Sequence, residues 1–255
     1  MTGQSPVLAI VVPDLYHVSV TFFHEHIKAI APGRTVVVHL STTRSNAKTT
    51  VPALEVVKAR PWPVPFLPVL STAVRQVNEF RQNRLDKRQA ATVRQFLRDH
   101  AVTHLFAEFA TSGVVIAPLA RELGLPLKAM SHGWDINVIG QMPHWRARYA
   151  GLFRSDVKLA AVVPFLHDRM AEIRAPREKI AIVPCAVNAE PFLVVDQLSV
   201  APPRVVMVSR LTPQKGPLAS LAAFCQAATK RDDLTLSTSW GVSLLEGMGT
   251  APCRS

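Results

Sequence analysis

Two cations share one short loop of the sequence, Arg210 and Lys215 in SRLTPQKGPL (209–218). The loop follows a predicted strand and precedes a helix opened by Pro217, a residue favoured in the first helical turn. A helix N-terminus attracts anions through its dipole and free N–H groups, and Arg adds a bidentate contact to phosphate. The pattern predicts a phosphate or diphosphate site, with a solvated basic loop as the alternative.

A second candidate is HGWD (132–135), which directly follows another predicted strand. His132 exchanges a proton near neutral pH, so it could contact a phosphate, a sugar hydroxyl or a developing charge. Asp135 is expected either to orient His132 or to cap the next helix. The alternative is that His132 is a structural loop histidine.

The third candidate is Glu246, which lies in the apolar run GVSLLEGMG (241–249) near the end of the chain. The run predicts a helix, and an unpaired carboxylate on an apolar helix is costly unless something binds it. A polyhydroxyl ligand would donate hydrogen bonds to Glu246. The alternative is an amphipathic helix from which Glu246 points to solvent.

The elements that must position these residues alternate between β-branched runs and longer helical patterns. Strands are predicted at 7–12, 34–40, 53–59, 103–109, 125–131, 157–163, 179–187, 204–209 and 233–238. Helices are predicted at 17–31, 71–100 with an interruption near Leu85, 112–124, 142–155, 164–174 and 217–231. This alternation predicts an α/β protein with a doubly wound parallel sheet, which binds ligands at the carboxyl ends of its strands.

Three segments follow from this pattern. Residues 1–190 are expected to form one Rossmann-like domain, and 191–203 to form a linker. Residues 204–255 begin a second, incomplete Rossmann-like domain. The segment 60–70 carries four prolines and is predicted to contain no regular element.

Composition narrows the class of protein. The chain has 255 residues, 48% of them hydrophobic and 18% charged, as in globular proteins. Its apolar runs are shorter than the roughly 18 to 20 residues of a membrane span, and its start does not resemble a signal peptide. Three widely spaced cysteines predict free thiols in a reducing cytoplasm rather than disulfides or a zinc site.

The net charge of +11 is concentrated in the predicted helix 71–100 and in residues 144–154. Basic helices attract anionic lipid, nucleic acid or phosphates, and a solvated helix face is an equal alternative. Nucleic acid is disfavoured because surface aromatics and zinc-finger, KH or RRM signatures are lacking. Adsorption of helix 71–100 to an anionic membrane surface remains open. A P-loop and a GxGxxG dinucleotide site are also missing.

Taken in order, these stretches resemble family 4 glycosyltransferases, retaining enzymes of the GT-B fold with two facing Rossmann-like domains. SRLTPQKG resembles that family's GRL-x-x-x-KG loop, and SLLEGMGTAP resembles its LLEAMA-x-G-x-P helix. HGWDI is similar to HGYDI, and SVTFF (19–23) to SETFI, of colanic-acid-type exopolysaccharide enzymes. The stretch 149–192 is similar to the segment that ends in Gly-Val-Asp and then Phe.

The resemblance implies a role for each candidate. Arg210 and Lys215 would hold the diphosphate of a nucleotide-sugar donor, and Glu246 the ribose hydroxyls. His132 would lie beside the transferred sugar in the catalytic site. Transfer to a glycan or lipid-linked acceptor would retain the anomeric configuration without a cofactor or divalent metal. The location would be the cytoplasm, or the inner face of the cytoplasmic membrane.

The sequence departs from the family in its second domain. Thr238 occupies the position of the first Glu in the family's pair of Glu residues separated by seven residues. Only nine residues separate Lys230 from Trp240, where the family has several βα units. In the first domain, CAVN (185–188) replaces Asn-Gly-Val-Asp.

Three functions are therefore open. The first is a glycosyltransferase of exopolysaccharide or cell-surface polysaccharide synthesis. The second is a truncated, inactive relative that acts as a binding module or is a non-functional fragment. The third is a basic α/β protein that binds anions or nucleic acid. The ordered set of motifs favours glycosyl transfer, while Thr238 and the short second domain leave enzymatic activity an open question.

Overall fold

The structure is a computed structural model of the chain. It describes residues 5–13, 22–41, 50–58, 61–64, 83–185, 204–209, 212–240 and 249–250, together with isolated positions between 70 and 81. The chain divides into two compact units, Met1–Asn188 and Ala189–Ser255, and each is considered by itself. The predicted linker 191–203 lies outside the described residues.

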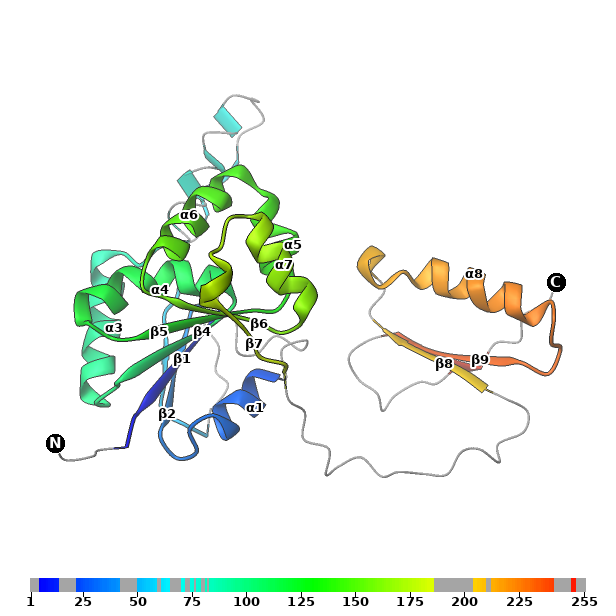
Figure 1. Cartoon of the computed structure of the whole chain (residues 1–255), viewed down its shortest axis with the longest axis horizontal. Helices are drawn as coiled ribbons and strands as arrows, with labels where there is room; N and C mark the ends of the chain where they lie inside the picture. The colour runs from blue at the N-terminus through cyan, green and yellow to red at the C-terminus, as the bar shows by residue number, and fades with distance from the viewer. Residues whose placement is uncertain are drawn as a thin grey trace. The chain divides into compact units, whose positions relative to one another are not determined.

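The first unit is built on a parallel sheet of seven strands in the order β3-β2-β1-β4-β5-β6-β7 (Figure 1). The strands are β1 (Leu8–Val12), β2 (Thr35–His39), β3 (Ala53–Glu55), β4 (His104–Glu108), β5 (Leu127–Ser131), β6 (Lys158–Ala161) and β7 (Ile180–Ile182). The strand order reverses direction between β1 and β4. This confirms the doubly wound α/β fold, and such sheets bind ligands at the reversal.

Helices connect these strands. They are α1 (Phe22–Ala29), α3 (Lys87–Asp99), α4 (Ala110–Leu123), α5 (Trp134–Asn137), α6 (Pro143–Arg154) and α7 (Pro164–Glu172), with 3-10 turns at Ile139–Gln141 and Arg177–Lys179. Local sequence sets several ends. Asp86 and Gln89 form a capping box at the start of α3. Gly124 ends α4 in the left-handed conformation, as predicted.

The interruption predicted near Leu85 is present. Residues 83–86 are not helical, and α3 starts only at Lys87. The described positions between 70 and 81 that flank this break are helical. Residues 61–64, from the proline-rich segment, form no regular element, as predicted.

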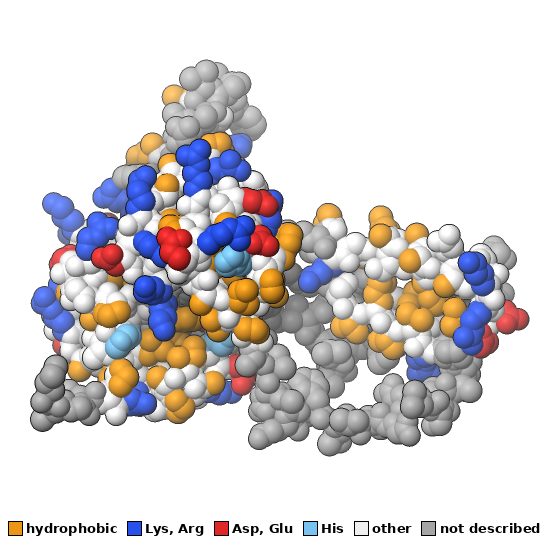
Figure 2. Space-filling model, viewed as in Figure 1, with side chains coloured by type: hydrophobic (Ala, Val, Ile, Leu, Met, Phe, Trp, Pro, Cys, Tyr) orange, Lys and Arg blue, Asp and Glu red, His pale blue; other side chains and the backbone are white. Residues whose placement is uncertain are grey.

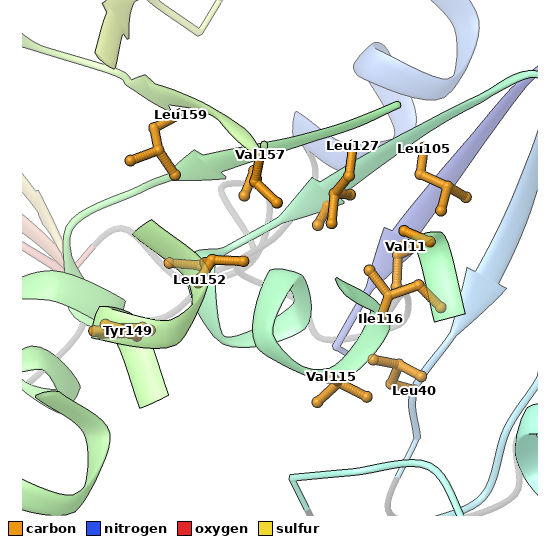
Figure 3. Packing of buried hydrophobic residues seen from close by; sticks show 14 of the residues in the cluster. Val11, Leu40, Leu105, Val115, Ile116, Leu127, Tyr149, Leu152, Val157 and Leu159 are labelled. Atoms are coloured by element: carbon orange, nitrogen blue, oxygen red, sulfur yellow. The ribbon is translucent and has the colours of Figure 1, made fainter. Parts of the chain in front are cut away.

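Both faces of the sheet are apolar, because alternate residues of each strand point to opposite sides. Ala9 and Val11 of β1 pack into the large cluster with α4 and α6, whereas Ile10 and Val12 pack with α1. Figure 3 shows the large cluster, with Ile116 of α4 close to the strands. Figure 1 shows α1 on the opposite side of the sheet from α4 and α6.

The second unit contains β8 (Arg204–Ser209), the 3-10 turn Pro213–Lys215, α8 (Pro217–Ala228), β9 (Thr235–Trp240) and β10 (Gly249–Thr250). β8 and β9 are parallel, and β10 pairs antiparallel with β9. The prediction of a helix over 241–249 is wrong at its last residue, Gly249, which pairs with Thr238 in a strand. Glycine is a poor helix former, so backbone pairing prevails there. Residues 241–248 lie outside the described residues.

Candidate active site

Three titratable side chains meet where β4 and β5 end. Glu108 is the last residue of β4, and its side chain is fully buried. His132 follows the last residue of β5, and His26 comes from α1. The site therefore lies at the carboxyl edge of the sheet, next to the reversal in strand order.

The Glu108 carboxylate bridges the two imidazoles. Its Oε1 lies 2.6 Å from Nδ1 of His26, and its Oε2 lies 2.6 Å from Nε2 of His132. Both carboxylate oxygens thus accept short, charge-assisted hydrogen bonds from ring N–H groups. A buried carboxylate needs such partners to remain ionised.

Cys185, which follows β7, closes the cluster on its other side. Its Sγ lies 3.6 Å from Nδ1 of His132, and the sulfur and His26 also shift one another's pKa. Glu108, His132, Cys185 and His26 therefore form a cluster, called the ring below, that contains two acids and two imidazoles. With all four groups ionised, the ring carries two negative and two positive charges and is neutral.

The ring shifts the pKa of every member. Hydrogen bonds to Cys185 and Glu108 raise the pKa of His26 to about 10. Burial lowers the pKa of His132, but its hydrogen bonds to Cys185 and Glu108 prevail and raise it to about 9. Burial raises the pKa of Glu108, but hydrogen bonds from both histidines hold it below its ordinary value. His132 is thus a cation at neutral pH.

Aromatic rings enclose the His132 imidazole. The ring centroid of Phe22 lies 4.5 Å from that of His132, and the centroid of Phe109 lies 5.0 Å away. Phe109 connects β4 to α4 with a positive φ of 70°, a conformation that costs energy for a residue with a side chain. The turn places the Phe109 ring beside the imidazole in an edge-type contact with an interplanar angle of 70°.

Asp135 fixes the backbone around His132. Its Oδ1 accepts hydrogen bonds from the N–H groups of His132 and Gly133, at 3.2 and 3.1 Å, and from Ser131 Oγ at 2.9 Å. Its Oδ2 accepts the N–H of Ala110, the first residue of α4, at 2.8 Å. Asp135 orients the His132 loop, as expected. However, the helix it caps is the preceding α4, because that N-terminus meets the loop across the sheet edge.

The donor-side candidates are only partly described. Arg210 and Glu246 lie outside the described residues. Lys215 is exposed at the end of a 3-10 turn, and Gly216 with φ 58° leads directly into α8 at Pro217. The structure thus brings Lys215 to a helix N-terminus, the setting in which a cation and free N–H groups favour an anion. Thr238 lies within β9, opposite Gly249.

Sequence reasoning missed Glu108, His26 and the participation of Cys185. A carboxylate at the end of a buried strand was the available signal for Glu108, because that position faces the ligand edge of a parallel sheet. For His26 the signal was its place on the helix that follows the first strand. Cys185 was predicted only to be a free thiol, which the structure bears out.

Two absences concern the described part of the chain alone. Within it, no group of three or more His, Cys, Asp or Glu side chains is arranged to hold a metal ion. None of the helices described there has the length and apolar character needed to cross a membrane.

Comparison with known proteins connects this fold to glycosyltransferases. No family model matches the chain. The chain is 32% identical over 114 residues to WcaL of Escherichia coli (strain K12), a putative colanic acid biosynthesis glycosyltransferase. That match covers 43% of this chain and 28% of WcaL.

Solved structures extend the likeness to most of the chain. HepE of Anabaena, in complex with UDP and glucose, matches with a TM-score of 0.59 at 15% identity, over 90% of this chain and 60% of HepE. A glycosyltransferase of Rickettsia africae has a TM-score of 0.59 at 14% identity, over 94% of this chain and 62% of its own. The lipopolysaccharide outer core galactosyltransferase WaaB has a TM-score of 0.52 at 12% identity, over 92% of this chain and 68% of WaaB.

The chain therefore has the fold of GT-B glycosyltransferases and is similar in sequence to a colanic-acid glycosyltransferase. It spans about 60% of the length of HepE.

Proposed function

We propose that the chain takes part in retaining glycosyl transfer of the family 4 type. A sugar would pass from a nucleotide-diphosphate sugar to a glycan or lipid-linked acceptor in exopolysaccharide or other cell-surface polysaccharide synthesis. The observation that carries the proposal is the buried Glu108–His132 pair at the carboxyl edge of the sheet. The similarity to WcaL supports sugar transfer as the chemistry of that edge.

His132 would act as a cation rather than as a base. Its pKa of about 9 keeps the imidazole protonated at neutral pH, and Glu108 retains one of its two N–H groups at 2.6 Å. The other nitrogen, Nδ1, has only the long 3.6 Å contact with Cys185 Sγ. An oxygen of the sugar or of the leaving diphosphate could replace that contact. A preorganised cation in a low-dielectric site then stabilises negative charge as it develops.

The donor diphosphate would be held by Lys215 and Arg210 at the start of α8, and the ribose by Glu246. Support comes from the exposed Lys215 ammonium immediately before the helix N-terminus. HepE is described with UDP and with UDP-glucose, so uridine nucleotides are the first donors to try. The two cations, rather than a divalent metal, would neutralise the leaving group.

Nucleotide binding tests the donor side. Calorimetric titration of the whole chain with UDP and other nucleoside diphosphates should show saturable binding. Lys215→Ala and Arg210→Ala should each weaken that binding about tenfold, the effect of losing one charge-assisted hydrogen bond. Lys230→Ala is the matched control, because Lys230 is an exposed lysine just beyond the opposite end of α8. Unchanged binding in both loop variants would defeat the assignment.

Transfer from a labelled nucleotide sugar tests His132. His132→Asn should reduce kcat at least about hundredfold with little change in KM, because the lost cation acts on developing charge. His104→Asn is the control, since His104 is exposed at the amino end of the same strand that ends in Glu108. Equal rates in the two variants would remove His132 from the mechanism.

The basic stretch 71–100 supports a second element of the proposal, adsorption to the inner face of the cytoplasmic membrane. Lys87, Arg88 and Arg98 are exposed on α3. Figure 2 shows Lys and Arg side chains spread over the visible face of the first unit, with some acidic groups among them. Salt-sensitive co-sedimentation with phosphatidylglycerol vesicles, lost in Lys87→Glu/Arg88→Glu, is the expected result. Equal retention on neutral phosphatidylcholine vesicles would contradict it.

A further inference from the structure

Cys185, at the edge of the site, lies close to groups that favour a reactive thiol. Cys185 Sγ lies 3.6 Å from Nδ1 of His132, and the opposite nitrogen of that ring is hydrogen-bonded to Glu108 at 2.6 Å. The His132 imidazole thus contacts the Cys185 sulfur through one nitrogen and the Glu108 carboxylate through the other. This is the arrangement in which an imidazolium ion, held in place by a carboxylate, stabilises a neighbouring nucleophilic thiolate.

We propose that Cys185 is a modification site, a nucleophilic thiolate that is oxidised by hydrogen peroxide and alkylated by soft electrophiles. The side chains that face the sulfur among the described residues are His132, from the loop after β5, and His26, from α1. His132 lies at hydrogen-bond distance from the sulfur, and Glu108 accepts hydrogen bonds from both imidazoles, which favours their protonated forms. Removal of a proton from the thiol therefore completes the neutral ring of two cations and two anions.

The electrostatics agree with this geometry. Burial raises the pKa of Cys185, but hydrogen bonds from His132 and His26 prevail and lower it to about 7. A large fraction of the sulfur is then thiolate at neutral pH, whereas an ordinary thiol with a pKa near 8.5 is a few per cent ionised. The side chain is also partly exposed, so small reagents have access to it.

The oxidation step balances with the groups present and one peroxide molecule. The Cys185 sulfur attacks one peroxide oxygen, an S–O bond forms and the O–O bond breaks. The leaving hydroxide takes the Nδ1 proton of His132 and departs as water. Sulfur loses two electrons and becomes the sulfenic acid, while His132 becomes neutral. A thiol reductant reverses the change.

Oxidation would also change the proposed site. It inserts an oxygen between sulfur and Nδ1, the nitrogen assigned above to the substrate, and it removes the negative charge that helps to keep His132 protonated. Peroxide should therefore lower transfer activity. This consequence rests on the proposed function, but the reactivity of the thiol does not.

Alkylation rates test the thiolate directly. Cys225→Ser/Cys253→Ser leaves Cys185 as the single thiol, and Cys185→Ser/Cys253→Ser leaves Cys225 for comparison. The rate with iodoacetamide should rise with pH through a midpoint near 7 for Cys185. At pH 6 it should exceed the rate of an ordinary thiol by about sixfold, because about thirtyfold more thiolate is offset by about fivefold lower nucleophilicity. A midpoint at or above about 8.5 overturns the proposal.

The histidine partner is tested in the same single-thiol chain. His132→Asn should move the midpoint toward that of an ordinary thiol, and His104→Asn should leave it unchanged. Circular dichroism establishes that each variant is folded. Should His132→Asn not fold, the midpoint of the single-thiol chain with His132 intact decides the matter. An unmoved midpoint in folded His132→Asn would remove His132 as the activating group.

Peroxide treatment followed by dimedone trapping tests the oxidation. Mass spectrometry should find the adduct on Cys185 ahead of Cys225, and dithiothreitol added before dimedone should prevent it. No adduct on Cys185 overturns the oxidation step. If Cys185 is oxidised but transfer continues at its former rate, the effect on His132 is refuted. If no transfer occurs even before oxidation, the proposed function fails and the thiol assignment stands.

Discussion

The two units of this chain bury similar apolar residues to different extents. In the first unit, helices on both faces of the sheet bury valines of β1 and β2 completely, among them Val11 and Val37. In the second unit, Val206 and Val208 of β8 and Leu218 of α8 are exposed. Figure 2 shows hydrophobic side chains gathered on the visible face of that unit.

The units also differ in whether their charged side chains are buried or exposed. The first unit contains a buried ring of Glu108, His26, His132 and Cys185 in which every member has partners. In the second unit, Lys215 is exposed, and the described pair Arg231–Asp233 lies at the surface. A buried charge requires a rigid, well-packed surround. The comparison therefore associates the buried ring with the unit whose sheet is packed against helices on both faces.

Separating the two units gives the largest expected effect. The fragment 1–188 should unfold cooperatively, with a Tm within about 5 °C of the whole chain, because its core is made within the fragment. The fragment 189–255 should show no cooperative transition, since so short a segment buries little surface. Calorimetry of both fragments checks this. A sharp transition in 189–255 would show that the second unit is stable by itself.

Substituting one valine in each unit tests this difference in burial within the whole chain. Val11, which is labelled in Figure 3, is fully buried, so Val11→Ala should leave a cavity and lower the free energy of unfolding by about 2 kcal/mol. Val206→Ala, at 53% exposure on β8, should change it by less than about 0.5 kcal/mol. Urea titration provides both values. Equal losses of unfolding free energy in the two variants would mean that Val206 of β8 is buried in solution.

The buried ring predicts a pH-dependent loss. Glu108→Gln should lower the free energy of unfolding by about 3 kcal/mol near pH 6, because the two imidazolium groups lose their buried negative partner and one of their two acceptor oxygens. Glu122→Gln is the control, since the surface pair Arg94–Glu122 should contribute less than about 1 kcal/mol.

The sign of the pH dependence follows from the direction of each shift. The pKa values of His26 and His132 are raised from 6.5, so their contribution is complete below pH 6.5 and is lost as the pH rises toward 9 to 10. The pKa of Glu108 is lowered from 4.5, so its contribution is lost as the pH falls below 4.5 through the folded value. The difference in unfolding free energy between wild type and Glu108→Gln should be largest between pH 4.5 and pH 6.5. A difference independent of pH would rule out the ionised ring.

The sequence predicted the parts of this molecule that depend on local pattern. Strand and helix periodicity gave the parallel sheet, Gly124 marked the end of α4, and His132 was placed at the carboxyl edge. The ring was not predictable in this way, because His26 and Glu108 are 82 residues apart, and His132 and Cys185 are 53 apart. Only the order of strands in the sheet brings these residues together. The assigned roles of Arg210, Lys215 and Glu246 remain predictions.

The smallest expected effects come from one glycine in each unit. Gly151 lies exposed within α6, and an added Cβ would meet nothing within 4 Å. Gly151→Ala should therefore stabilise the chain by about 0.5 to 1 kcal/mol, through the better helix propensity of alanine. Gly216, by contrast, has φ 58° at the start of α8, so Gly216→Ala should cost about 1 kcal/mol of backbone strain.

Asparagine separates backbone strain from other effects at Gly216. It tolerates the left-handed conformation better than alanine, so Gly216→Asn should recover part of the loss. Urea titration followed by circular dichroism gives the values for all three variants. If Gly216→Ala is neutral while Gly151→Ala stabilises, the turn before α8 contributes nothing to the measured unfolding. The loop that carries Lys215 would then, like the exposed apolar residues of the second unit, contribute little to the stability of the chain.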